Sequence, residues 1–228
     1  MTTSRAERRQ QLDQQIVELG RMQLSKVGAA ALSLRAIARE LNLVSSAVYR
    51  YVDSRDELLT RLVIVAYDEL GEAVEASVAR ASGPPEARLA TAMRAFRLWA
   101  VDHPAEFALL YGSPVPGYQA PPERTTAPGT RVIAVLLRLL SEAAQAGTLR
   151  TSGPPPPGEP LCADLRAIAA EFGAALDEAD VLAALGLWTW LLGAVGQEVF
   201  DGYGQATFAD PGAVFEAQLV RQLAALGR

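Results

Sequence analysis

Apolar residues recur every three or four positions along most of the chain, which is the spacing of a helix with one buried side. No alternating pattern typical of a strand is visible, so the sequence predicts an all-α fold. The stretch 112–130 contains five prolines and three glycines and is expected to be a loop or only partly helical. Residues 151–160, TSGPPPPGEP, read as an exposed polyproline-like linker. Helices are predicted over residues 6–27, 55–81, 85–102, 130–146, 161–175, 179–201 and 211–226, and a break at residues 102–104 is followed by the short segment AEFALLYG.

Residues 28–59 predict two short helices around a tight turn, followed by the start of a third helix. Ser33 is placed to cap the first helix, because its hydroxyl can accept a hydrogen bond from a free backbone N–H. Asn42 stands at the turn, where its tolerance of left-handed backbone angles is useful. Ser45 or Ser46 is expected to begin the second helix, with Ser45 as the alternative cap. The apolar face of the first helix is formed by Leu34, Ile37, Ala38 and Leu41.

The second short helix combines two inward valines with an outward aromatic and basic face. Val48 and Val52 are expected to point inward, which leaves Tyr49, Arg50 and Tyr51 outside together with Ser46. Tyrosine and arginine suit contacts to DNA grooves and phosphates through hydroxyl, guanidinium and flat ring. The alternative is a helical corner of an ordinary bundle with half-buried tyrosines. The pattern therefore favours a helix-turn-helix that reads the major groove of DNA.

The run GAAALSLRAIARELNLVSSAVYRYVDSRDELL resembles the N-terminal DNA-binding domain of the TetR family of bacterial transcriptional regulators. The resemblance implies that Tyr49, Arg50 and Tyr51 contact DNA, and that Ser33 and Arg55 hold backbone phosphates. Asn42 replaces the usual turn glycine, Tyr51 the usual histidine and Arg55 the usual lysine. Of these departures, the one at Tyr51 bears on the DNA sequence preference. The full set of predicted DNA-binding residues is Ser33, Arg35, Ser45, Ser46, Tyr49, Arg50, Tyr51 and Arg55.

The distribution of charge agrees with a DNA-binding N-terminus. The 228-residue chain carries a net charge of −5. Residues 1–59 contain nine basic and seven acidic residues, a net charge of +2, whereas the remainder contains 12 and 19, a net charge of −7. A local excess of basic residues in the N-terminal part is typical of a DNA-binding domain in an otherwise acidic protein.

Catalytic and metal sites have little support in the sequence. His103 is the single histidine and Cys162 the single cysteine, so a catalytic triad or a cysteine-rich zinc site has few residues to draw on. His103 lies between an acid and a proline at a predicted helix end, where capping and packing are the simpler role. The glycines are dispersed rather than gathered into a phosphate-binding loop. We therefore expect no enzyme, no metal and no cofactor.

A second resemblance covers about fifteen residues around Trp99, His103-Pro104 and Gly112. It is similar to a C-terminal domain type of some TetR-family regulators that is named for its Trp, His and Gly, and it implies a ligand-binding and dimerisation domain. Aromatic residues could line an apolar pocket there, although most aromatic sets at helical spacing belong to the core. The predicted ligand-binding residues are Phe96, Trp99, His103, Phe107, Tyr111 and Trp188.

Residues 181–196, VLAALGLWTWLLGAVG, carry no charge. A membrane span needs about 20 such residues, so we expect no membrane association. A helix that is apolar on all sides must be buried on all sides, either as the central helix of a monomer or against a second subunit. Gly186, Gly193 and Gly196 would let a partner helix approach closely. Together with the 211–226 helix, this segment predicts a four-helix homodimer interface.

The sequence as a whole predicts a two-domain, all-helical regulator. Residues 1–59 would form the helix-turn-helix DNA-binding domain and residues 60–228 a helical ligand-binding and dimerisation domain. The expected protein is a cytoplasmic dimeric repressor that binds a pseudo-palindromic double-stranded DNA operator and is released by a small-molecule effector, with the 55–81 helix, roughly 40 Å long, as the link. The alternatives are a regulator without an effector, and a small-molecule carrier or enzyme with an incidental helix-turn-helix corner.

Overall fold

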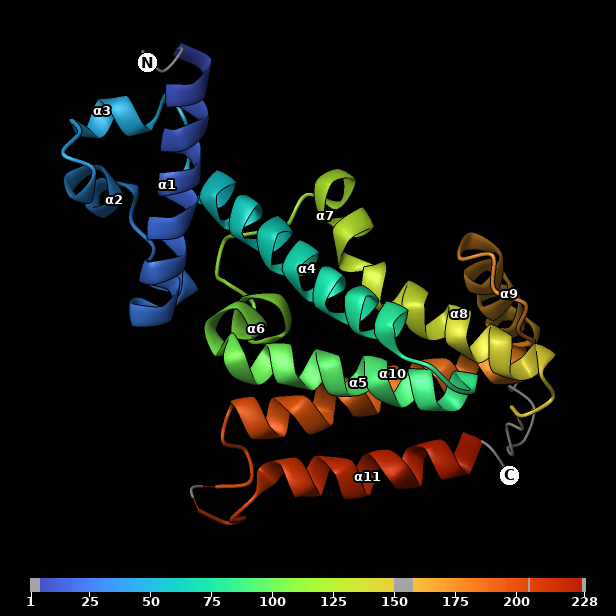
Figure 1. Ribbon diagram of the computed structural model, residues 1–228. Helices are drawn as coiled ribbons and strands as arrows, with labels where there is room; N and C mark the ends of the chain where they lie inside the picture. The colour runs from blue at the N-terminus through green and yellow to red at the C-terminus, as the bar shows by residue number, and fades with distance from the viewer. Residues whose placement is uncertain (1–4, 150–157, 205, 227–228) are drawn as a thin grey trace. The chain divides into compact units, whose positions relative to one another are not determined.

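The computed structural model describes residues 5–149, 158–204 and 206–226, which form eleven α-helices and one 3-10 turn with no strand among them (Figure 1). These residues divide into two compact units. The first unit runs up to Glu69 and includes His103–Gly129; the second contains Leu70–Asp102 and the residues from Thr130 onward. The domain division expected between residues 59 and 60 stays a prediction, because the units are defined by contacts and have bounds of their own.

The first unit is built around the helix-turn-helix. Its helices are α1 (Arg5–Val27), the turn η1 (Ala29–Ala31), α2 (Leu34–Glu40), α3 (Ser45–Val48), the first part of α4 (Arg55–Arg80), α6 (Pro104–Tyr111) and α7 (Pro122–Gly129). The buried core draws on four of these helices, with Ile16, Ile37, Val48 and Leu58 completely enclosed. Burying an aliphatic side chain of this size stabilises the fold by about 1.5–3 kcal/mol, so the short helices α2 and α3 depend on this shared core.

The segment between α5 and α8 completes the same core. Leu109 of α6 and Val115 and Tyr118 of the following loop pack against the helix-turn-helix cluster. Helix α6 also packs along α1. The helix-turn-helix head is therefore made from two stretches of chain that are far apart in the sequence.

The second unit is a helical bundle. It contains the last part of α4, α5 (Pro85–Asp102), α8 (Arg131–Gln145), α9 (Glu159–Glu171), α10 (Glu178–Val199) and α11 (Pro211–Leu226). Helix α5 packs on α8 and α10, and α10 packs on α9 and α11 (Figure 1). Phe96, Leu139, Leu191 and Leu219, from four different helices, are fully buried between them.

The helix bounds agree closely with the sequence pattern except at the end of α9, where a glycine turn ends the helix early. The helix expected to reach residue 175 stops at Glu171, because Gly173 adopts a left-handed φ of 60° and the Ala174 amide donates back to the Ala169 carbonyl at 2.8 Å. The stretch 112–130 is partly helical, as predicted, through α7. Most of the predicted 151–160 linker lies outside the described residues.

Candidate DNA-binding site

Ser33 caps the start of helix α2, as the sequence predicts. The Ser33 hydroxyl accepts a hydrogen bond from the Ala36 amide at 3.3 Å. Gln23 of α1 holds the same residue from the other side, since its Oε1 accepts from the Ser33 amide at 3.0 Å. Asn42 ends the helix with a φ of 54°, which confirms the predicted left-handed turn. Arg35 and Arg39 are exposed on the outer side of α2.

Helix α3 places its valines inside and its polar residues outside. Val48 and the following Val52 are fully buried, whereas Ser45, Ser46, Tyr49 and Arg50 are exposed on the outer surface. Tyr49 is 41% exposed, and the side chain of Arg50 makes no hydrogen bond or ion pair with any other described residue. Two side chains suited to groove contacts are thus left open to a partner.

Two predictions about α3 need correction. Ser45 is the first helical residue, not the cap, and the cap position falls on Val44, whose side chain cannot accept a hydrogen bond. Tyr51 is half-buried and packs against the core cluster, whereas the sequence pattern placed it outside with Tyr49. The reason is that α3 ends at Val48, so the chain turns before Tyr51 and no longer follows the helical face.

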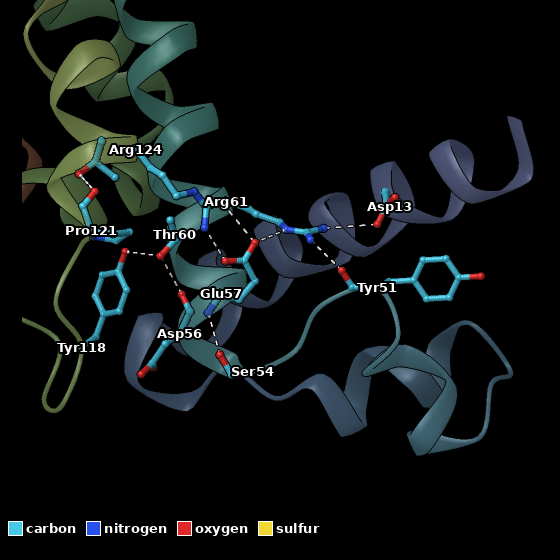
Figure 2. Close-up of polar contacts among 11 residues, drawn as sticks. Asp13, Tyr51, Ser54, Asp56, Glu57, Thr60, Arg61, Tyr118, Pro121 and Arg124 are labelled. Atoms are coloured by element: carbon cyan, nitrogen blue, oxygen red, sulfur yellow. Dashed lines mark hydrogen bonds and ion pairs between the residues drawn. The ribbon is translucent and has the colours of Figure 1, made fainter. Parts of the chain in front are cut away.

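Arg61 of α4 holds the chain that follows α3 in place (Figure 2). Its Nη2 donates to the Tyr51 carbonyl at 2.7 Å, and its Nη1 donates to Asp13 of α1 at 3.3 Å. Its Nε donates to Glu57 one turn earlier at 2.8 Å. One half-buried guanidinium therefore joins α1, α4 and the chain leaving α3, and Figure 2 shows the Tyr51 ring pointing away from this network.

Glu57 connects the same network to α7. Its carboxylate accepts from Arg124 Nη1 at 2.6 Å as well as from Arg61 (Figure 2). These hydrogen bonds, that from Arg124 foremost, hold the pKa of Glu57 below its usual value. Glu57 stays ionised near neutral pH, and so the link between α4 and α7 persists there.

Two more contacts tie the 103–129 segment to the head. The Tyr118 hydroxyl lies 3.1 Å from the hydroxyl of Thr60, a buried residue of α4, and burial raises the pKa of Tyr118. Arg21 of α1 donates to Glu69 Oε1 at 2.5 Å and to Glu106 of α6 at 3.1 Å. These pairs bridge separations of up to 85 residues in the sequence, so no local pattern could have indicated them, although the Glu57–Arg61 spacing could have been noticed.

Arg55 has an intramolecular role that the sequence did not suggest. Its Nη2 donates to the Ala29 carbonyl at 2.9 Å and the Ala30 carbonyl at 3.1 Å, and so braces the turn between α1 and α2. The predicted phosphate contact would have to be made alongside these two hydrogen bonds. It stays a prediction, as do the DNA contacts of the other residues in the set.

The predicted ligand-binding residues fall into two groups, one in each unit. In the second unit the rings of Phe96 and Trp188 pack edge to face with their centroids 5.6 Å apart, and Trp99 is also buried there. In the first unit the rings of Phe107 and Tyr111 pack together with their centroids 5.3 Å apart. Burial raises the pKa of Tyr111. His103 caps α6 through its backbone carbonyl, which accepts from the Phe107 amide at 2.9 Å.

The aromatic residues therefore pack in the core of each unit, and an effector site formed by them stays a prediction. Across the described part of the chain, no group of three or more His, Cys, Asp or Glu side chains is placed to hold a metal ion.

Two family models match the sequence. One, described as bacterial regulatory proteins of the tetR family, matches residues 16–62; the other, described as a Tetracyclin repressor-like C-terminal domain, matches residues 89–222 and alone spans more than half of the chain. The first match contains the helix-turn-helix described above. The narrower likeness to the Trp-His-Gly type stays a resemblance.

Individual relatives agree with these matches. The HTH-type transcriptional regulators Rv1816 of Mycobacterium tuberculosis and Mb1846 of Mycobacterium bovis are each 46% identical over 218 residues, which is 94% of this chain and 92% of each relative. The solved structure of the regulatory protein SCO4313 is 31% identical, with a TM-score of 0.77, and covers 97% of this chain and 100% of that chain.

A more distant solved structure shares the fold. AibR in complex with isovaleryl coenzyme A and operator DNA has a TM-score of 0.61 at 15% identity, covering 92% of this chain and 96% of that one. The exposed α3 face, the family models over both units and the mycobacterial relatives lead to one conclusion. The chain belongs to the TetR family of bacterial transcriptional regulators and is a DNA-binding regulator.

Proposed function

We propose that this protein is a dimeric repressor that binds a pseudo-palindromic operator and is released by a small molecule. The observation that carries the proposal is the exposed pair Tyr49 and Arg50 at α3. The helix-turn-helix that presents this pair is stabilised by hydrogen bonds of Arg61 to the chain after α3 and of Glu57 to α7. Two-fold symmetry would place the two recognition helices in successive major grooves, about 34–36 Å apart. Tyr49 and Arg50 would read base edges or the groove wall, and Tyr51 would support them.

The remaining predicted residues would position the head on the DNA backbone. Ser45 and Ser46 are exposed at the start of α3, and Arg35 is exposed on α2, so each is accessible to a phosphate. Ser33 already caps α2 through its hydroxyl, and its phosphate contact would add to that role. Arg55 would place charge near the phosphates from the start of α4.

The proposed dimer uses an uncovered face of α10 and α11. The outward residues of α10 repeat with helical spacing and include two glycines beside which a built Cβ would meet nothing within 4 Å. These outward residues are Leu182, Gly186, Thr189, Gly193 and Gln197, and the exposed Phe200 follows directly after the helix. Helix α11, which lies beside α10 (Figure 1), adds Ala213, Ala217, Val220 and Ala224 on one face. Small apolar residues exposed on two adjacent helices favour close packing against a second copy.

The length of α10 has a second interpretation that we do not adopt. Residues Glu178–Val199 are long and apolar enough to cross a membrane by composition, and only 28% of the most apolar window is buried. The second subunit proposed above would cover the exposed remainder. We therefore propose a cytoplasmic protein whose partners are operator DNA, an effector and a second copy of itself, with no catalytic activity.

The proposed effector would be bound by the second unit, as its match to a Tetracyclin repressor-like C-terminal domain suggests. AibR, a distant relative in fold, was solved with a coenzyme A thioester and its operator. An effector among Phe96, Trp99 and Trp188 would have to open packed aromatic contacts, and the same holds for His103, Phe107 and Tyr111 in the first unit. Release from DNA requires that the effector bind one conformation better than the other.

Fluorescence anisotropy against tiled DNA from upstream of the protein's own gene tests the proposal. At fixed salt and with a scrambled competitor, we expect one tile to be bound far more tightly than the rest. Uniform weak binding that disappears when salt is added would contradict specific recognition of this region, because non-specific binding is dominated by phosphate charge.

Replacing Arg55 by Ala is expected to weaken binding to all DNA sequences about equally. One lost phosphate contact lowers the slope of log K against log salt by about 0.9. Binding titrations at several salt concentrations measure this slope, with Arg80→Ala, at an exposed position on α4, as the matched control. A less stable variant with an unchanged slope would show that Arg55 serves only the Ala29 and Ala30 carbonyls.

A further inference from the structure

A pocket of about 560 Å³ opens in the second unit along one face of α8. Its lining repeats with the period of that helix and includes Ala134, Val135, Arg138 and Gln145. This volume lies within the range of small-molecule sites, about 300–1,000 Å³. None of the residues predicted from the sequence to bind an effector belongs to its lining.

The wall facing α8 is the turn between α9 and α10. Phe172, Gly173, Ala174 and Ala175 line the pocket there. The left-handed φ of 60° at Gly173 reverses the chain directly after α9, so this wall is set by backbone hydrogen bonds to the end of that helix. With Ala134 and Val135, the turn gives the pocket an apolar surface.

The charged side of the pocket contains two arginines. Arg131 donates to Glu75 of α4 through Nε at 2.9 Å and Nη2 at 2.7 Å, and these hydrogen bonds hold the pKa of Glu75 below its usual value. Glu75 therefore remains an anion near neutral pH. Arg131 also fills the space beside Gly71, where a built Cβ would lie 2.7 Å from its Nε.

Of the two arginines, Arg138 makes fewer hydrogen bonds to other residues. It is half exposed and donates a single hydrogen bond, from Nη1 to Glu142 at 2.7 Å, within the described residues. A guanidinium has five N–H donors, so most of its capacity is open to a ligand. Glu142 also accepts a hydrogen bond from Arg88 of α5 at 2.5 Å, so its negative charge is shared between Arg88 and Arg138.

We propose that this pocket binds an organic carboxylate, with the anionic group at Arg138 and Arg131 and the hydrocarbon part against Val135, Phe172 and Ala174. The geometry supplies what such an amphiphile needs: guanidinium donors that match a carboxylate in shape and charge, next to apolar surface that is partly shielded from water. This inference rests on the proposed function in one respect, in that it identifies the class of effector.

The pocket is connected to the DNA-binding head through the chain itself. Glu75 lies on α4, the same continuous helix that carries Arg55 and Arg61. A carboxylate that competes with Glu75 for Arg131 would weaken the contact between α8 and α4. The ligand would thus favour a conformation in which that contact is open, as a population shift requires.

The test is a titration of the full-length, ¹⁵N-labelled protein with octanoate, followed by the NMR shift of the Gly173 amide. Arg138→Gln and Arg131→Gln are each expected to weaken binding by about tenfold or more, since each removes charge-assisted hydrogen bonds. Glu75→Gln is expected to tighten binding several-fold, because it removes a competing anion. Arg166→Gln, which replaces an exposed, ion-paired arginine outside the lining, should bind like the unmodified protein.

Several outcomes would overturn the inference. Equal binding of octanoate by the Arg138→Gln and Arg166→Gln variants, or equal binding of 1-octanol by the unmodified protein, would show that the arginines do not recognise the anion. Binding of inorganic phosphate as tight as that of octanoate would show that the apolar wall plays no part. The gain expected for Glu75→Gln is a readout that a poorly folded variant cannot imitate.

The regulatory part is tested with the same probe and operator DNA. Octanoate is expected to lower the operator affinity of the unmodified protein and to leave that of Arg138→Gln unchanged. Octanoate binding without any effect on DNA affinity would refute the effector role. Intact specific DNA binding without octanoate binding would overturn the pocket assignment and leave the proposed function in place.

Discussion

Introducing a glutamate at Gly193 is expected to convert the proposed dimer into monomers and to reduce operator affinity by about 100-fold or more. Gly193 is exposed on α10, and a built Cβ there meets nothing within 4 Å, so the fold of one chain accepts a side chain at this position. A buried, unpaired carboxylate between two subunits is costly. The affinity falls because the second half-site no longer binds as part of the same molecule, which contributes a factor of about 10²–10⁴.

Sedimentation velocity measures the oligomeric state of the Gly193→Glu variant, and anisotropy measures its operator affinity. Ala167→Glu on α9 is the matched control, because it adds the same charge at an exposed helical position outside α10 and α11. A Gly193→Glu protein that remains dimeric and binds DNA normally would rule out this face as the interface.

Replacing Arg50 by Ala is expected to weaken specific operator binding about 5- to 150-fold, the effect of removing one bidentate base contact of about 1–3 kcal/mol. Within the described chain the side chain of Arg50 makes no hydrogen bond or ion pair, so the free energy of unfolding should change by no more than about 0.5 kcal/mol. Discrimination between operator and scrambled DNA should fall together with affinity.

The control for Arg50 is Arg80→Ala, which removes an exposed arginine from the far end of α4. Competition anisotropy gives the specificity ratio, and thermal unfolding confirms that both variants are folded. Operator affinity and specificity that stay at the level of the unmodified protein would refute the assignment of α3 as the reading element.

The sequence could predict elements whose cause is local. Helix periodicity placed α1, α4, α5 and α11 close to their observed bounds, and Ser33 and Asn42 marked the two ends of α2. The predictions of helix ends and of side-chain exposure were wrong where the backbone conformation ends a helix early. The early end of α9 depends on the Gly173 turn, and the half-burial of Tyr51 depends on α3 stopping at Val48.

Long-range ion pairs were beyond the sequence. Nothing in the pattern joins Arg21 to Glu106, or Glu57 to Arg124, because charged residues on exposed helix faces have many possible partners. The pocket along α8 was missed for the same reason. Nothing in the sequence sets Arg131 and Arg138 apart from other charged residues, and only the fold brings Glu75 and the α9–α10 turn beside them.

The composition of the first unit has a practical consequence for work with fragments. A fragment ending at residue 62, where the tetR-family match ends, would lack Leu109, Val115 and Tyr118, and the surface they cover on the helix-turn-helix core would face water. It would also lack Glu106 and Arg124, the partners of Arg21 and Glu57. A transplantable DNA-binding module from this protein must therefore combine the N-terminal helices with residues 103–129, joined by a designed connection.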